Sequence, residues 1–145
     1  MAKAELGLVD GLFQLGFLLQ SRLARIAATH ELSLIQVRLL GILRDREPGM
    51  LELARHLELE KSSLSGLVDR AEARGLVERV ASREDRRATS VRLTARGRQL
   101  SRAVEAEVET DVGALLGELP DKDRERLGAI VGRVVAAAGN LLDDA

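Results

Sequence analysis

The chain has 145 residues, of which 46% are hydrophobic and 31% charged, and its formal net charge is only −1. This length predicts one domain with a substantial core. There is no cysteine, which excludes disulfides, thiolate zinc sites and cysteine chemistry. The start lacks the pattern of a secretory signal, and the apolar stretch 127–142 is too short for a bilayer and contains Arg133. We therefore expect a cytoplasmic protein with no membrane partner.

The N-terminal third predicts a long helix followed by a central one. Apolar residues recur every three or four positions over residues 8–26, as on one face of a helix that ends near residues 29–32. Ser33 and Gln36 then have the spacing of a capping box, which marks the start of the next helix. Because that helix is apolar on most sides and stops before Pro48, we expect it to lie at the centre of the fold.

Two further helices are predicted at residues 50–59 and 61–75. In the second, apolar residues fall at positions i, i+3, i+4 and i+7, which is one buried stripe. Gly75 can supply the left-handed residue that ends this helix. The residues expected in the core are Leu51, Leu53, Ala54 and Leu57 on the first helix and Leu64, Leu67, Val68 and Ala71 on the second.

The pattern changes from helical to alternating after Gly75. Residues 76–80 and 89–93 predict the strands of a β-hairpin, joined by the loop SREDRRA at 82–88. A helix-turn-helix followed by such a hairpin is a winged helix-turn-helix. We therefore expect a mainly α-helical fold with a small β-hairpin, in which residues 33–97 form a DNA-binding lobe.

Helical apolar stripes return in the C-terminal third. They run over residues 100–119 and, after a break at Pro120, over residues 127–142. Like the first helix, these helices have no sufficiently large apolar partner within one chain. We therefore expect residues 1–30 and 100–145 to be dimerisation helices that pair with a second copy of the chain.

Charge is distributed unevenly along the chain. Residues 61–98 carry ten basic and five acidic side chains, net +5, whereas residues 99–145 carry net −5. A basic segment of this kind indicates an anionic partner. Arg83, Arg86 and Arg87 lie in the hairpin loop, from which arginines can reach the narrow minor groove of DNA.

The helix at 61–75 offers a polar face that suits a major groove. Ser62 and Gly66 lie opposite its apolar stripe, with Ser65 and Arg70 beside them. Small hydroxyl side chains at the start of a helix permit close approach to DNA and can bond base edges or phosphates. An ordinary solvated helix surface would have the same composition, and the basic loop that follows favours the DNA interpretation.

The segment GLVERVASREDRRATSVRLTARG at 75–97 resembles the wing of the MarR family, bacterial regulators of the multiple-antibiotic-resistance type. The family signature is Asp-x-Arg followed by a strand that ends Leu-Thr-x-x-Gly, and it corresponds here to Asp85, Arg87 and residues 93–97. Residues 53–80 are similar to the family's recognition-helix segment. The resemblance extends to the order and lengths of the helices over the whole chain.

The resemblance implies roles for several residues. Arg87 would be the minor-groove arginine and Asp85 its structural partner. Relatives touch DNA at the positions of Ser62, Ser63 and Ser65. Two residues depart from the family pattern: Gly66 replaces a larger, often basic residue, and Ala71 replaces the usual leucine, which thins the core under the helix.

The resemblance also implies a function. The expected protein is a dimeric, sequence-specific regulator of transcription that binds a pseudo-palindromic operator in double-stranded DNA. It would be a repressor relieved by a small aromatic or phenolic ligand, held near Phe13, Phe17 and Arg38 by the first, second and fifth helices. A winged-helix protein-interaction module without DNA binding remains the alternative.

Other chemistries find no support in the sequence. His30 and His56 are the only histidines and do not belong to a metal-ligand cluster. No glycine-rich phosphate loop or nucleophile motif occurs. We therefore expect no cofactor, no metal and no enzymatic activity.

Overall fold

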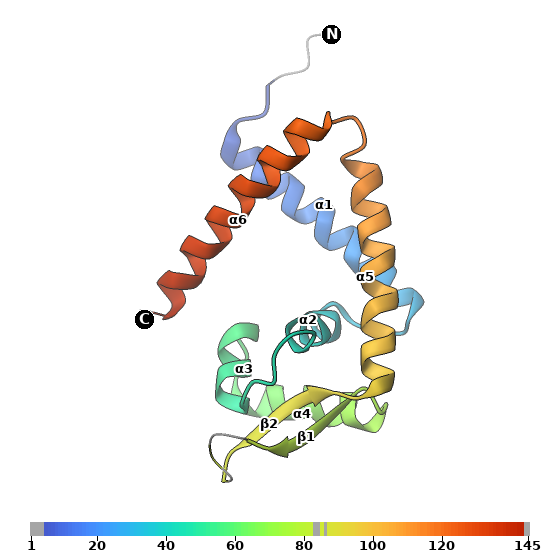
Figure 1. The fold of residues 1–145 in the computed structure, drawn as a ribbon, viewed down its shortest axis with the longest axis vertical. Helices are drawn as coiled ribbons and strands as arrows, with labels where there is room; N and C mark the ends of the chain where they lie inside the picture. The colour runs from blue at the N-terminus through green and yellow to red at the C-terminus, as the bar shows by residue number, and fades with distance from the viewer. Residues whose placement is uncertain (1–4, 83–84, 86, 144–145) are drawn as a thin grey trace. The chain divides into compact units, whose positions relative to one another are not determined.

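A computed structural model of the chain describes residues 5–82, 85 and 87–143, with only the backbone for 140–143. Within these residues the fold has six helices and one two-stranded antiparallel sheet (Figure 1). The elements are α1 (Leu8–Thr29), α2 (Leu34–Leu43), α3 (Met50–Leu57), α4 (Lys61–Ala73), β1 (Val77–Ala81), β2 (Thr89–Leu93), α5 (Ala95–Leu115) and α6 (Asp121–Asp143). The predicted fold class, mainly α with a small β-hairpin, is confirmed.

The chain divides into two compact units, Met1–Glu109 and Thr110–Ala145. The first unit contains α1 to α4, the hairpin and most of α5. The second contains the end of α5 and the whole of α6. Helices α2 to α4 and the hairpin of β1 and β2, which make up the winged helix-turn-helix, all belong to the first unit.

The core of the first unit surrounds α2, as its apolar composition predicts. Leu39, Leu40 and Leu43 are buried, and α2 contacts α1, α3 and β2. The capping box at the start of α2 is present: the Ser33 hydroxyl accepts the N–H of Gln36, and the Gln36 side chain accepts the N–H of Ser33. Local sequence therefore determines where this central helix begins.

The end of α4 is a glycine-terminated turn of the expected kind. Gly75 has φ = 73°, in the left-handed region that glycine adopts without strain. The N–H of Gly75 donates to the carbonyl of Glu72, and the N–H of Leu76 donates to the carbonyl of Ala71. These two bonds form a Schellman motif, and Leu76 is buried immediately after it.

A clasp joins the end of α4 to the start of α5. The Thr94 hydroxyl donates to the carbonyl of Gly75 at 2.6 Å and accepts the N–H of Gly97 at 3.0 Å. The N–H of Thr94 donates to the carbonyl of Leu76 at 3.1 Å. Gly97 is buried so close to this carbonyl that an added Cβ would lie 1.9 Å from its oxygen. The Leu-Thr-x-x-Gly sequence is therefore a structural connection between helix and wing.

The sheet has one further partner outside the hairpin. β1 and β2 pair in antiparallel register, with Val77 opposite Leu93 and Ala81 opposite Thr89. Gly49 forms an isolated antiparallel bridge with Ser90. The residues before α3 therefore lie against β2, which brings α3 beside the wing (Figure 1).

Three sequence predictions need correction. Leu51 is 72% exposed, because the face of α3 that carries it turns away from the core containing Leu53 and Leu57. The stripe predicted on one helix through Leu119 is interrupted, since α5 ends at Leu115 and a turn follows. The first strand lies one residue later than predicted, at Val77–Ala81.

The described helices differ from membrane-spanning helices in their combination of length and hydropathy. No single one is long and apolar enough to cross a bilayer. Helices α1 and α2 meet these requirements only as a pair, and they are bent by 89° relative to each other.

Candidate nucleic-acid interface

The buried and exposed faces of α4 lie where the sequence predicts. Its stripe of Leu64, Leu67, Val68 and Ala71 is at most 2% exposed. Ser62 and Ser63 are exposed, Ser65 is partly exposed, and Arg70 is exposed. The first two turns of α4 therefore present hydroxyl groups to solvent, beside the core-facing stripe.

Gly66 makes room for an arginine on the same surface. A Cβ added at Gly66 would lie 3.1 Å from Nη1 of Arg70, so this guanidinium folds back over the glycine. Position 66 is often basic in the MarR family. Here it is a glycine, and the guanidinium of Arg70, one turn later, lies over it. This arrangement keeps a cation beside the serines of α4.

In the wing, Asp85 contacts Arg87 through the backbone N–H of Arg87 and not through its guanidinium. The Asp85 carboxylate accepts the backbone N–H of Arg87 at 2.9 Å, and the Asp85 carbonyl accepts the N–H of Ala88 at 3.0 Å. These bonds fix the turn and leave the Arg87 side chain exposed. The predicted wing residues Arg83 and Arg86 lie outside the described residues.

Arg79, on β1, binds two acids of α4. Its Nη1 lies 2.8 Å from the Asp69 carboxylate and also contacts the Glu72 carboxylate. Burial alone lowers the pKa of an arginine, but hydrogen bonds and charge from both carboxylates outweigh it, so the pKa of Arg79 is raised. The bridge attaches α4 to the sheet and neutralises two of its acids.

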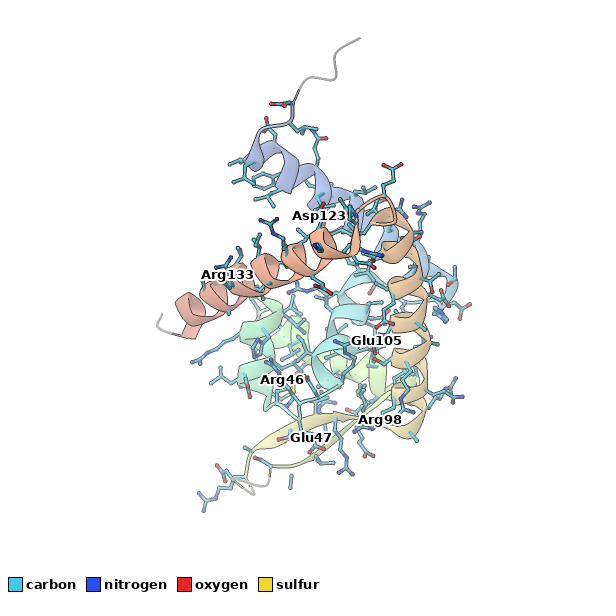
Figure 2. All side chains as sticks on the ribbon, turned by 45° about the horizontal axis from the view of Figure 1, so that its top comes forward. Arg46, Glu47, Arg98, Glu105, Asp123 and Arg133 are labelled. Carbon is cyan, nitrogen blue, oxygen red and sulfur yellow. The ribbon has the colours of Figure 1, made fainter. Side chains whose placement is uncertain are left out.

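A second ion pair joins the two strands of the hairpin. Arg92 Nε lies 2.6 Å from Glu78 Oε1, and the two residues are opposite each other in the hairpin. Among the described residues, the acids of the basic segment are thus held by Arg79, by Arg92 and by the backbone N–H of Arg87. The exposed cations that remain in the described part of this segment are Lys61, Arg70, Arg87, Arg96 and Arg98. Figure 2 shows Arg98 on the first turns of α5.

Arg74 connects the C-terminal end of α4 to the turn between α1 and α2. Its guanidinium donates to the carbonyl of Glu31 at 2.8 Å and to that of His30 at 3.1 Å. The His30 ring in turn lies 2.8 Å from the Glu107 carboxylate of α5. These contacts fix the C-terminal end of α4 against the rest of the first unit.

The predicted ligand residues are not brought together. Arg38 lines a cavity of about 360 Å³ between α1, α2 and α5, together with Leu23, Val37 and Val108. Phe13 and Phe17 do not line this cavity, and they are 65% and 69% exposed. Arg38 also donates to the carbonyl of His56 at 3.3 Å, which connects the cavity wall to α3.

No metal centre emerges from the described part of the chain. Within it, no group of three or more histidine, aspartate or glutamate side chains is arranged to hold a metal ion. His30 and His56 instead contact Glu107 and Glu52, respectively.

Comparison with known proteins identifies the central part of the chain. The sequence model of the MarR family matches residues 30–88, which run from the end of α1 to the wing. This segment belongs to the MarR family. Proteins of that family regulate transcription, and the matched MarR-family segment contains α4, both acids of the Arg79 bridge and the described part of the wing loop. No curated protein sequence matches the chain.

Solved structures show the same fold over almost the whole chain. A crystal structure of MarR is 20% identical, with a TM-score of 0.81, and covers 100% of this chain and 99% of its own. NadR in complex with 4-hydroxyphenylacetate is 23% identical, with a TM-score of 0.73, over 92% and 96% of the two chains. A Staphylococcus aureus MepR mutant bound to an oligodeoxyribonucleotide is 17% identical, with a TM-score of 0.63, over 92% and 99%.

Sequence reasoning missed the structural arginines of this surface. Arg74, Arg79 and Arg92 add to the basic count of the segment, yet each is bound within the fold. For Arg92 and Glu78 the pairing follows from the strand register, which the predicted hairpin could have given. The contacts of Arg74 join residues more than forty positions apart, so no pattern of neighbouring residues in the sequence predicts them.

Proposed function

We propose that the chain is a sequence-specific, double-stranded-DNA-binding regulator of transcription that acts as a homodimer. The observation that carries this proposal is the exposure of Ser62 and Ser63 on α4 next to a wing whose Arg87 is exposed, while the nearby acids are neutralised internally. In this arrangement α4 enters the major groove and Arg87 the adjacent minor groove. The solved MepR complex with an oligodeoxyribonucleotide supports the assignment.

Homodimer formation is supported by the apolar side chains that the single chain leaves exposed. On and beside α1 these are Leu6, Leu8, Val9, Leu12, Phe13, Phe17 and Leu18, and on α6 they are Ile130, Val131, Val134 and Val135. This many exposed large apolar side chains on one helix favours an interaction surface. A two-fold dimer would present two copies of α4 to half-sites about 34 Å apart, and so would read a pseudo-palindromic operator.

Repression relieved by a small ligand completes the proposal. The cavity between α1, α2 and α5 has Arg38 in its wall beside apolar side chains, a composition that suits an aromatic or phenolic anion. Arg44 also lines it and is paired with Glu105, and Glu109 is the other acid of the wall. NadR was solved with 4-hydroxyphenylacetate, which is such a compound. This part of the proposal is tested by adding 4-hydroxyphenylacetate to the protein–DNA complex and measuring how much protein dissociates from the DNA.

Replacing Ser65 with alanine should weaken binding to the operator by about 1–3 kcal/mol, since a hydroxyl that contacts a base edge is lost. Ser65 is only partly exposed but lies off the core stripe, so the melting temperature should hardly change. Fluorescence anisotropy with labelled DNA gives the affinity. Ser21→Ala, the same change on an exposed position of α1, is the control. A lowered melting temperature with unchanged affinity would show that Ser65 supports the fold and does not contact DNA.

The wing prediction separates an ordered loop from a merely cationic one. Arg87→Ala should reduce the slope of log affinity against log salt by about one, because one phosphate-neutralising cation is lost. Asp85→Ala should weaken binding by roughly 0.5–1.5 kcal/mol, because the carboxylate no longer holds the N–H of Arg87.

Asp85→Asn is the matched control for the wing. Its side-chain oxygen can still accept the N–H of Arg87, but it removes the negative charge. If Asp85 positions the wing, the asparagine variant should bind DNA at least as well as the natural chain, and the alanine variant less well. If both variants bind more tightly at every salt concentration, the loop acts only through its charge.

A winged-helix module that binds proteins and not DNA remains the competing function. A gel shift with the DNA upstream of the chain's own gene separates the two. Retardation that disappears in the combined variant Ser65→Ala, Arg87→Ala supports the regulator. Absence of any retarded species over a broad fragment pool would favour the interaction module.

A further inference from the structure

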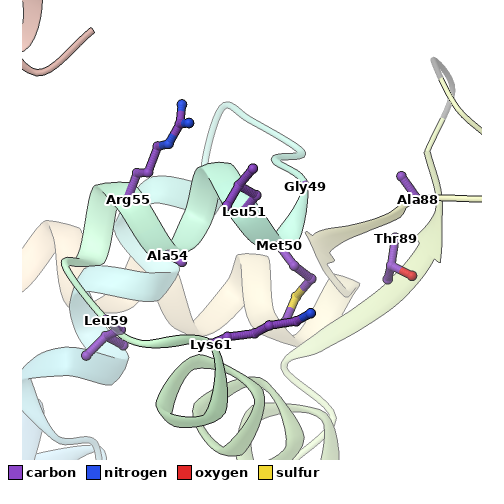
Figure 3. A pocket seen from close by; sticks show the side chains of 9 residues that line it. All are labelled: Gly49, Met50, Leu51, Ala54, Arg55, Leu59, Lys61, Ala88 and Thr89. Carbon is purple, nitrogen blue, oxygen red and sulfur yellow. The ribbon is translucent and has the colours of Figure 1, made fainter. Parts of the chain in front are cut away.

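A second cavity lies between α3 and the wing, away from α1 and α5. It is a groove of about 740 Å³, within the range of small-molecule sites. Its walls come from α3, the turn that follows, the start of α4 and the start of β2 (Figure 3). Its lining residues are Gly49, Met50, Leu51, Ala54, Arg55, Leu59, Lys61, Ala88 and Thr89.

The floor and sides of this groove are apolar. Met50, Leu51, Ala54 and Leu59 supply most of the α3 side, and no described residue covers Leu51, which is 72% exposed. Full burial of a leucine side chain is worth about 1.5–3 kcal/mol relative to exposure. An apolar ligand body would therefore gain free energy by covering Leu51.

The charged side chains that line the groove are all positive. Lys61 and Arg55 are the charged residues that line it, and neither forms an ion pair with a carboxylate among the described residues. Figure 3 shows the Lys61 side chain extending from the start of α4 toward Thr89, and Arg55 pointing outward. The nearby acids Glu58 and Glu60 are exposed and do not line the groove.

We propose that this groove binds a small amphipathic anion, with its apolar body on Met50, Leu51 and Leu59 and its anionic head on Lys61. A medium-chain carboxylate has this chemistry. The groove separates the start of α4 from the wing, and under the proposed function the DNA backbone passes between these two elements. The bound anion would occupy Lys61 and this space, so it would compete with DNA directly. Only this competition, and not the site, rests on the proposed function.

Calorimetric titration with octanoate, below its micelle concentration and without DNA, tests the site. We expect saturable binding that octanol and octylammonium do not reproduce, since neither carries an anionic head. Lys61→Gln should weaken octanoate binding about fivefold, as for a solvent-exposed ion pair. Leu51→Gln should weaken it about tenfold, and because Leu51 is exposed this change should leave the fold intact.

Arg38→Gln, in the wall of the other cavity, is the matched control and should leave octanoate binding unchanged. Absence of saturable binding, equal binding of octylammonium, or a loss in Arg38→Gln equal to that in Leu51→Gln would overturn the site. If the chain binds octanoate as expected but binds no DNA, the site stands and the proposed function fails.

The competition is tested with a DNA duplex that the chain binds. The dissociation constant for DNA should rise in proportion to octanoate concentration without a plateau. Leu51→Gln should bind DNA normally without octanoate and need about tenfold more of it for the same effect. A plateau, or an equal response in Leu51→Gln, would overturn direct competition.

Discussion

Replacing Gly97 with alanine is expected to destabilise the chain by roughly 3 kcal/mol and to lower its melting temperature by about 10 °C. The added Cβ would lie 1.9 Å from the backbone oxygen of Leu76, so a backbone segment and not a flexible side chain must move. That oxygen also accepts the N–H of Thr94, and its displacement breaks the clasp between α4 and α5. Thermal unfolding followed by circular dichroism measures the loss.

Gly41→Ala is the control for this prediction. Gly41 is an exposed glycine inside α2, and nothing lies within 4 Å of the Cβ that alanine would add. Alanine is favoured over glycine in a helix interior by about 1 kcal/mol, so this variant should melt at a higher temperature. If Gly97→Ala were also neutral or stabilising, Leu76 and Gly97 would not be as close in solution as the structure has them.

The clasp also gives a physical reason for a motif that the sequence could only match to a family. Thr94 begins α5 and fixes the C-terminal end of α4 through the carbonyl of Gly75. Gly97 permits the close approach that this requires. The Leu-Thr-x-x-Gly signature therefore positions α4 relative to the wing, through contacts within the chain.

The features that the sequence predicted correctly depend mostly on residues that are close together in the chain. The capping box at Ser33, the left-handed turn at Gly75 and the cap at Thr94 each depend on residues within a few positions, and all are present. The buried stripe of α4 follows from helical periodicity alone. Elements with such signals at their ends could be placed to within one or two residues.

Long-range placement explains the failures. Leu51 has the hydrophobicity and spacing of a core residue, but its side of α3 faces a groove bounded by Ala88 and Thr89, and this neighbourhood has no sequence signal. The basic count of residues 61–98 likewise could not separate Arg74 and Arg79, which hold the fold together, from Arg87, which is exposed. That distinction requires the positions of carbonyls and carboxylates far along the chain.

Charge introduced on exposed apolar side chains of α1 should abolish dimerisation and weaken DNA binding strongly. Leu12 and Phe17 are 59% and 69% exposed in the single chain, so the double variant Leu12→Lys, Phe17→Lys should retain its secondary structure. Its mass by light scattering should be that of one 15.8 kDa chain, whereas the natural chain should have twice that mass. Because the two half-sites would no longer be bound together, operator affinity should fall by roughly 100-fold or more.

Gln14→Lys controls for the added charge on this helix. Gln14 is polar and exposed, so this variant adds one lysine to α1 without removing apolar surface, and it should remain a dimer that binds DNA. A natural chain with the mass of a monomer at micromolar concentration would exclude the proposed dimer. A double variant that is still dimeric would place the interface elsewhere. In that case the apolar side chains of α6, from Ile130 to Val135, are the next positions to charge, because they are about half exposed or more.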